Sequence, residues 1–209
     1  MYSMRFNDCG ETPLGLYPVV DDYKKLLPLY EEGITTAQLR IKNRAIDEIE
    51  DEIINAIDIS NRFKVRLFIN DYWELAIKHK AYGIHLGQED IQEANIDAIY
   101  KAGIRLGIST HTTDEIKIAL DIEPSYVAIG PIYETTSKKM VYNPVGIEDL
   151  KRWGSSVDYP IVAIGGIDID NIKTVIDTNM ADGIAMIGGV LSEGEVDRDK
   201  TKSLLKCFR

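Results

Sequence analysis

Short apolar runs alternate with longer amphipathic segments eight times along the chain, and this repeat restricts the fold more than any other feature. The apolar runs have the length and composition of buried strands, whereas the longer segments carry apolar residues at helical spacing. We expect strands at residues 15–20, 36–40, 65–69, 83–86, 105–109, 126–129, 161–164 and 183–186. We expect helices at residues 22–32, 46–61, 72–80, 94–102, 113–122, 147–153, 171–178 and 201–207.

The pattern favours an α/β fold, a (β/α)8 TIM barrel in a single domain. Continuously apolar strands such as PIVAIGG are typical of a parallel sheet covered on both faces. Eight βα units in 209 residues match a compact barrel, and an open doubly wound sheet is the alternative. Because no linker or low-complexity tract interrupts the pattern, we expect one domain over residues 1–209, with its core at about 14–191 and a last helix near 201–208.

Composition excludes several classes of function. The net charge of -10 makes nucleic acid and anionic membranes unfavourable partners, so local cations must hold any anionic ligand. Cys9 and Cys207 stand near opposite ends without metal-ligand spacing, which argues against a zinc site or a disulfide framework. The sequence shows neither a signal peptide nor an apolar stretch near the ~20 residues of a membrane span. We expect a cytoplasmic protein that binds small molecules, and a homo-oligomer is left open.

Polar clusters follow the expected strands at their C-terminal ends, where a (β/α)8 barrel carries its reactive groups. In QLRIK, strand alternation turns Gln38, Arg40 and Lys42 to one side. Cations that face a barrel interior imply an anionic partner. The alternative is that the strand ends at Arg40 and that Lys42 belongs to ordinary loop surface.

The stretch RLFINDYWELA runs from a strand into a helix through Asn70 and Asp71. Asp71 and Glu74 have the spacing of a helix N-cap with its capping-box glutamate, so capping is the simplest prediction. The next strand is followed by GQED, which brings Glu89 and Asp90 toward Asp71 across neighbouring loops. Since Mg²⁺ commonly takes one or two protein carboxylates, these loops also predict a magnesium site.

Hydroxyl groups and glycines mark a second cluster. The stretch GPIYETTSKK contains Thr135, Thr136, Ser137 and Lys138, whose hydroxyl and ammonium groups are plausible phosphate ligands. The alternative is that the stretch is only a polar surface turn. Glycine pairs follow the seventh and eighth strands at 165–166 and 188–189, where many such barrels hold a phosphate. His85 alternates with apolar residues in its strand and is expected to be a structural, hydrogen-bonded residue. The sequence contains no recognisable Ser-His-Asp or Cys-His set.

From about residue 14 to residue 191, the sequence closely resembles the thiamine phosphate synthase family, also called thiamine phosphate pyrophosphorylase. The resemblance is carried in order by QLRIK, LFINDYWELAIKH, GIHLGQED, LGISTHT, AIGPIYETTSK and VAIGGI. It implies a (β/α)8 enzyme that joins 4-amino-2-methyl-5-pyrimidinylmethyl diphosphate to a thiazole phosphate and releases diphosphate.

The resemblance also implies a role for each matched residue. Asp71 and Asp90 correspond to magnesium ligands, and Gln38 and Asn70 to contacts with the pyrimidine and the diphosphate. The resemblance implies a diphosphate clamp made of Arg40, Lys42, Ser109 and Lys138. These are the expected catalytic residues, because the reaction needs charge stabilisation on the leaving diphosphate. The implied thiazole phosphate site consists of Thr135, Ser137, Gly166, Ile187 and Gly188. On this basis Asp71 is expected to cap a helix and to direct its carboxylate to the metal.

Three positions depart from the family pattern. Glu134 stands where the family often has Pro, Ser137 where it usually has Thr, and Gly188-Gly189 where Ser-Ala is more usual. Two other functions share the barrel: a paralogous thiazole phosphate isomerase (tautomerase), and a non-catalytic barrel that binds thiazole or thiamine phosphate. The isomerase needs no diphosphate site, so QLRIK, Asp71 and Asp90 argue against it.

Overall fold

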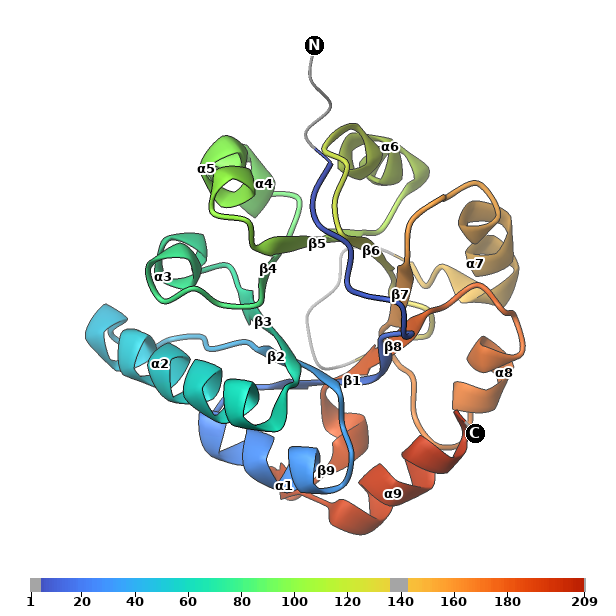
Figure 1. Cartoon of the computed structure of the whole chain (residues 1–209). Helices are drawn as coiled ribbons and strands as arrows, with labels where there is room; N and C mark the ends of the chain where they lie inside the picture. The colour runs from blue at the N-terminus through green and yellow to red at the C-terminus, as the bar shows by residue number, and fades with distance from the viewer. Residues whose placement is uncertain (1–4, 136–142, 209) are drawn as a thin grey trace.

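The computed structural model describes residues 5–135 and 143–208, and eight parallel strands at its centre form a closed barrel (Figure 1). The barrel strands are β1 (Gly15–Val20), β2 (Thr36–Leu39), β3 (Arg66–Asn70), β4 (Gly83–Leu86), β5 (Arg105–Thr110), β6 (Tyr126–Ile129), β7 (Ile161–Ile164) and β8 (Gly183–Met186). β1 pairs with β8 in the register Gly15 to Gly183 and Pro18 to Met186. This pairing confirms the (β/α)8 barrel and excludes the open doubly wound sheet.

Helices surround the ring of strands (Figure 1). They are α1 (Leu26–Glu31), α2 (Ile46–Phe63), α3 (Trp73–Lys78), α4 (Asp90–Glu93), α5 (Ile96–Lys101), α6 (Thr113–Asp121), α7 (Gly146–Gly154), α8 (Ile172–Ile176) and α9 (Arg198–Lys206), with 3-10 turns η1 (Tyr23–Lys25) and η2 (Gly188–Val190). None of the helices in the described ranges has the length and hydropathy needed to cross a bilayer.

Some elements differ from the sequence expectation. The single helix expected at 22–32 begins as η1 and continues as α1. Helix α4 and the antiparallel pair β9 (Leu191–Ser192) and β10 (Glu195–Val196) were not expected. Helix α9 begins at Arg198 rather than near residue 201, because the Asp197 side chain accepts a hydrogen bond from the Lys200 N–H at 3.0 Å and caps the helix there.

The hydrophobic interior has two layers separated by the strands. The outer layer lies between strands and helices and includes Leu39 and Ile41. The inner layer fills the barrel and is aromatic, with Tyr126 edge-on to Phe68 at 5.1 Å between ring centroids. Gly107 of β5 makes room for this packing, since a Cβ there would lie 2.1 Å from Tyr126 Cζ. Bulky rings from some strands therefore require glycine on their neighbours.

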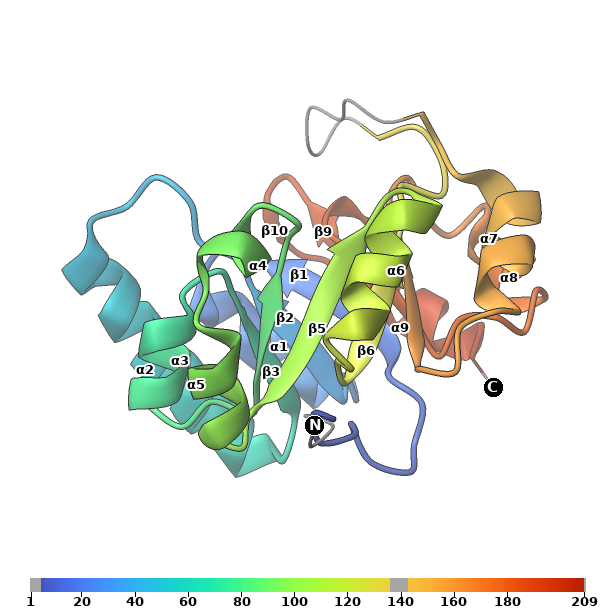
Figure 2. The same ribbon diagram turned by 90° about the horizontal axis from the view of Figure 1, so that it is seen from above.

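The N-terminal segment closes the barrel at the end where the strands begin. The buried Arg66 guanidinium donates hydrogen bonds to the backbone carbonyls of Thr12 at 2.8 Å and Pro13 at 2.7 Å. A further bond reaches the carbonyl of Cys9 at 3.2 Å. In Figure 2 this segment lies at the bottom of the view, and β9 and β10 lie toward the top. The opposite end, where the strands finish, is left to carry a ligand site.

Candidate active site

A pocket of about 610 Å³ opens at the C-terminal ends of the strands, and a smaller one of about 260 Å³ adjoins it over β6, β7 and β8. The expected site residues that line the larger pocket are Gln38, Arg40, Lys42, Asn70, Asp71, Asp90, Ser109, Thr135 and Ile187. The smaller pocket is lined by Thr135, Gly166, Ile187 and Gly188. Thr136, Ser137 and Lys138 lie outside the described residues. The structure thus brings every described candidate to one end of the barrel.

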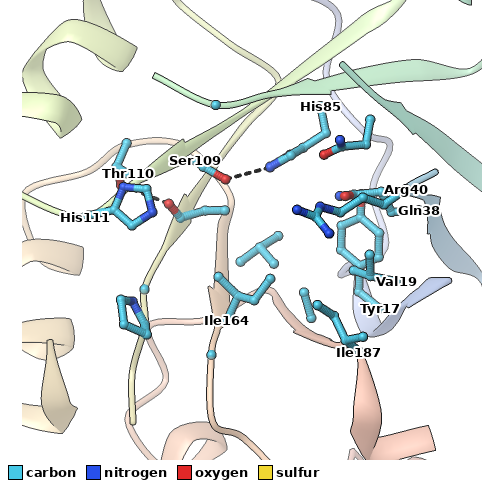
Figure 3. Close-up of a pocket in the computed structure, with 18 of the residues that line it drawn as sticks. Tyr17, Val19, Gln38, Arg40, His85, Ser109, Thr110, His111, Ile164 and Ile187 are labelled. Atoms are coloured by element: carbon cyan, nitrogen blue, oxygen red, sulfur yellow. Dashed lines mark hydrogen bonds between the residues drawn. The ribbon is translucent and has the colours of Figure 1, made fainter. Parts of the chain in front are cut away.

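Strand β2 and the residues after it supply the cations. Gln38, Arg40 and Lys42 all line the larger pocket, whereas the intervening Leu39 and Ile41 are buried in the outer layer. The three side chains therefore share one side as expected for QLRIK, but β2 ends at Leu39, so Lys42 reaches the pocket from the loop after the strand. Figure 3 shows Gln38 and Arg40 on one side of the pocket and Ser109 on the opposite side, with the Arg40 guanidinium directed into the space between them.

Asp71 lies at the pocket mouth but does not cap a helix, so that expectation was wrong. Helix α3 begins after Tyr72 and has no side-chain cap. Asp71 has φ 66°, a left-handed conformation that Asp tolerates better than most residues, and its carboxylate pairs with the Lys42 ammonium. Its N–H donates to the carbonyl of His85 at 3.0 Å, which ties the loop to the end of β4.

Asp90 is held by the turn that precedes it. Its Oδ2 accepts a hydrogen bond from the Gly87 N–H at 3.0 Å, and a Cβ on Gly87 would lie 2.9 Å from that oxygen. Oδ1 has no protein hydrogen-bond partner among the described residues. Three carboxylates therefore line one pocket from adjacent loops, those of Asp71, Asp90 and the exposed Glu89, while no cluster of three or more His, Cys, Asp or Glu residues within the described ranges could hold a metal. This donor set fits Mg²⁺, which completes its shell with water and phosphate oxygens.

Asn70 presents an unsatisfied donor to the pocket. It is the last residue of β3, directly opposite His85 in the register with β4. Its side-chain Nδ2 is buried and makes no hydrogen bond to any residue that the structure describes. Because a buried amide without a partner is costly, this nitrogen is a strong candidate to bind a ligand acceptor.

The smaller pocket is shaped by backbone rather than by side chains. The Ile132 and Tyr133 N–H groups donate to the carbonyls of Ile164 at 2.9 Å and Gly165 at 3.0 Å, so the loop after β6 runs along the end of β7. Gly166 has φ 68°, and a Cβ there would lie 2.4 Å from the Glu134 carbonyl oxygen. Only glycine fits this crossing. Glu134 itself is exposed at the pocket edge.

A second glycine pair lines the other wall of the smaller pocket. Gly188 and Gly189 begin the short turn η2, whose preceding residue Ile187 provides no side-chain cap. A Cβ on Gly188 would meet nothing within 4 Å, whereas one on Gly189 would lie 2.5 Å from Met186 Sδ. The uncapped N–H groups of this turn are the kind of donors that bind phosphate oxygens.

Sequence reasoning missed the polar interior beneath the pocket. Tyr17 and Tyr126 line the pocket, and so does His85, which is hydrogen-bonded as expected. Burial raises the pKa of both phenols well above the usual value, so both stay neutral. The alternation of side chains along each strand could have predicted these residues, because Tyr17 and Val19 of β1 lie on the same side of the strand and face the barrel interior.

Fold and site together define the class: a (β/α)8 barrel with a pocket lined by cations and carboxylates at the C-terminal ends of its strands. A family model described as thiamine monophosphate synthase matches residues 16–190. The chain belongs to the thiamine monophosphate synthase family. Its activity is accordingly that of a transferase that makes thiamine phosphate.

Individual relatives agree with the family model. The thiamine-phosphate synthase of Serratia proteamaculans (strain 568) is 48% identical over 196 residues, which cover 93% of this chain and 92% of the relative. That of Klebsiella pneumoniae is 49% identical over 178 residues, with 85% and 84% covered. The solved thiamine phosphate pyrophosphorylase from Pyrococcus furiosus superposes with a TM-score of 0.81 at 28% identity, covering 93% of this chain and 95% of that one.

Proposed function

We propose that the chain couples 4-amino-2-methyl-5-pyrimidinylmethyl diphosphate with 4-methyl-5-(2-phosphoethyl)thiazole, or its carboxylated form, and releases diphosphate. The observation that carries this proposal is the division of the site into two joined pockets of different chemistry. One holds cations, carboxylates and an unpaired amide, and the other holds backbone donors on glycine-rich turns. Two phosphorylated substrates in adjacent positions match this division.

The two pockets share part of their lining, so the pyrimidine ring of one substrate and the thiazole ring of the other would lie close together. Thr135, Ile164 and Ile187 line both cavities. With the diphosphate in the larger pocket and the thiazole phosphate in the smaller one, the reacting carbon and the thiazole nitrogen face each other near this boundary. Such alignment replaces a bimolecular encounter with a reaction between neighbours.

The proposed chemistry is a dissociative substitution. An electron-rich aminopyrimidine stabilises positive charge on its exocyclic methylene, so the carbon–oxygen bond breaks before the thiazole nitrogen donates its electron pair to that carbon. Diphosphate leaves with the bonding electrons, and no protein nucleophile is required. The protein must therefore stabilise charge on the leaving group and keep water from the cation.

Named residues divide these tasks. Arg40 and Lys42 place positive charge beside the leaving diphosphate, and Ser109 adds a hydroxyl from the opposite wall. The resemblance assigns Lys138 to the same clamp. Asn70 supplies the unsatisfied amide donor, and Gln38 presents its amide toward the pyrimidine. The apolar parts of Val19, Ile164 and Ile187 shield the space in which the cation forms.

We propose that Mg²⁺ binds between Asp71 and Asp90. When bound, the ion neutralises negative charge on the diphosphate as the leaving group separates. In the structure the Lys42 ammonium contacts the Asp71 carboxylate. In the proposed complex it shifts toward the phosphate oxygens of the diphosphate. The turn at Gly87 keeps Asp90 aimed at the pocket through its Oδ2 contact.

Product assays separate this function from its alternatives. Purified protein is incubated with both substrates and Mg²⁺, with each substrate alone, and with both plus EDTA, and thiamine phosphate is measured by its fluorescent oxidation product. The synthase makes product only in the complete mixture. A thiazole phosphate isomerase or a binding barrel yields no thiamine phosphate in any of them, which would contradict the proposal.

A further inference from the structure

A chain of hydrogen bonds crosses the interior of the barrel from Gln38 to Ser109. The Gln38 Nε2 lies 3.4 Å from the Tyr17 hydroxyl, which lies 3.0 Å from the Tyr126 hydroxyl. The Tyr126 hydroxyl lies 2.7 Å from His85 Nδ1, and His85 Nε2 lies 2.7 Å from Ser109 Oγ. Gln38, Tyr17, Tyr126 and His85 are all buried, so water does not compete for these bonds.

The amide at one end fixes the direction of the chain. An amide nitrogen has hydrogens but no lone pair to offer, so Gln38 donates and the Tyr17 oxygen accepts. The Tyr17 hydrogen must then go to the Tyr126 oxygen. Since burial keeps both phenols protonated, the Tyr126 hydrogen is in turn available for His85.

His85 extends this direction from Tyr126 to the pocket. The Tyr126 O–H donates to His85 Nδ1, which must carry a lone pair, so the imidazole proton resides on Nε2. His85 Nε2–H then donates to Ser109 Oγ. Because its oxygen accepts this bond, Ser109 turns its own hydrogen away from His85 and toward the pocket that it lines, and among the described residues Oγ has no second hydrogen-bond partner.

We propose that Tyr126 and His85 are positioning residues that orient Ser109 as a hydrogen-bond donor toward an anionic oxygen of the pyrimidine diphosphate. The inference rests on the proposed function, because it assigns the acceptor to the leaving group. A donor locked before substrate arrives requires no reorganisation as charge develops, and each bond in a buried chain polarises the next.

The reverse direction is chemically distinct. If the Gln38 oxygen faced Tyr17, every bond in the chain would reverse, the imidazole proton would sit on Nδ1, and Ser109 would donate to His85. The Ser109 oxygen would then present a lone pair to the diphosphate and repel it. The histidine tautomer therefore reports the direction without any measurement of activity.

The tautomer is tested by ¹⁵N NMR of the histidine-labelled protein at pH 8, with His85 assigned by its loss in His85→Gln. The proposal predicts the proton on Nε2 and an accepting Nδ1, whose resonance shifts when Tyr126→Phe removes the donor. A proton on Nδ1, or an Nδ1 resonance that ignores Tyr126→Phe, would overturn it.

A double-mutant cycle tests the effect on Ser109. Tyr126→Phe keeps the ring that packs on Phe68 and removes only the hydroxyl. We expect it to lower kcat by about 3–10-fold in the parent, the size of one neutral hydrogen bond, and by less than about 2-fold in the Ser109→Ala background. Equal losses in both backgrounds would show that Tyr126 acts independently of Ser109 and would overturn the proposal.

Tyr82→Phe is the matched control. Its ring also packs edge-on to Phe68, at 5.5 Å, but its hydroxyl donates to the Cys9 carbonyl at 3.1 Å, at the closed end of the barrel. It should leave kcat unchanged. If the protein did not catalyse the synthase reaction, the same double-mutant cycle would be measured with the Kd of inorganic diphosphate in place of kcat. A wrong assignment of the hydrogen-bond chain can therefore be distinguished from a wrong assignment of the function.

Discussion

The Lys42 ammonium, which follows β2, forms an ion pair with the Asp71 carboxylate, which follows β3. The two side chains are 46% and 21% exposed, so the pair lies at the pocket mouth within reach of both ligand and solvent. A partly exposed pair of this kind contributes little to stability. Its position instead suits a cation for the diphosphate and a carboxylate for the metal, held beside one another until substrate arrives.

Asp71→Asn should lower kcat by about 10²–10³-fold while leaving the protein folded, because it removes electrostatic stabilisation of the leaving group and no helix cap. Steady-state kinetics and thermal unfolding measure the two effects. Asp97→Asn is the control, since Asp97 pairs with Lys101 on α5 and lies outside both pockets. Loss of stability with normal turnover per folded molecule would give Asp71 a structural role only.

Gly166→Ala should destabilise the loop after β7 and raise KM for the thiazole phosphate. The residue has φ 68°, and the new Cβ would press on the Glu134 carbonyl. Gly188→Ala provides the contrast, because its φ is not positive and the space around its Cβ is open. Thermal unfolding of both variants is the measurement; equal destabilisation would contradict the close approach at Gly166.

Arg66→Met should reduce the free energy of unfolding by about 2–4 kcal/mol. The change leaves the buried carbonyls of Thr12 and Pro13 without their charged donor. Chemical denaturation measures the loss, and Arg62→Met, at an exposed position of α2, should change stability by less than about 0.5 kcal/mol. A parent-like midpoint for Arg66→Met would show that the N-terminal segment closes the barrel without this contact.

Stability should fall as the pH rises above about 10, where tyrosines of the unfolded chain ionise. Burial raises the folded-state pKa of Tyr17, Tyr30 and Tyr126, so the folded protein retains protons that the unfolded chain loses. Their contribution is complete below the unfolded pKa and is lost as the pH rises toward the folded pKa, by up to about 1.4 kcal/mol per pH unit for each group.

Denaturation at pH 9 and pH 11 measures this dependence. Tyr126→Phe should flatten it, whereas Tyr100→Phe, at the exposed surface of α5, should not. An unchanged slope for Tyr126→Phe would mean that the phenol ionises as readily inside the barrel as in the unfolded chain.

The architecture was predictable because each strand is recognisable in the sequence as a local apolar run. Since βα units connect with a right-handed crossover, there are few ways to arrange eight of them. The bounds of β1, β4, β6, β7 and β8 match expectation to the residue. Short elements such as α4 escaped notice, since four residues are too few for a helical period.

The site was predictable where chemistry follows strand ends, as with Arg40 and Asp90. It was not predictable where backbone conformation decides: Asp71 has a left-handed φ, Tyr72 takes the N-cap position and α3 begins at Trp73, so the Asp71 side chain does not cap the helix. The hydrogen-bond chain through Tyr17 and Tyr126 joins residues 109 positions apart, so only the closed barrel brings them together.

The most direct test of the proposed reaction is ³¹P NMR of the purified protein with both substrates and Mg²⁺. The account predicts that free diphosphate and the phosphate monoester of thiamine appear in equal amounts, and that neither appears when the thiazole phosphate or the metal is omitted. Both substrates persisting unchanged beside folded, ligand-bound protein would contradict it.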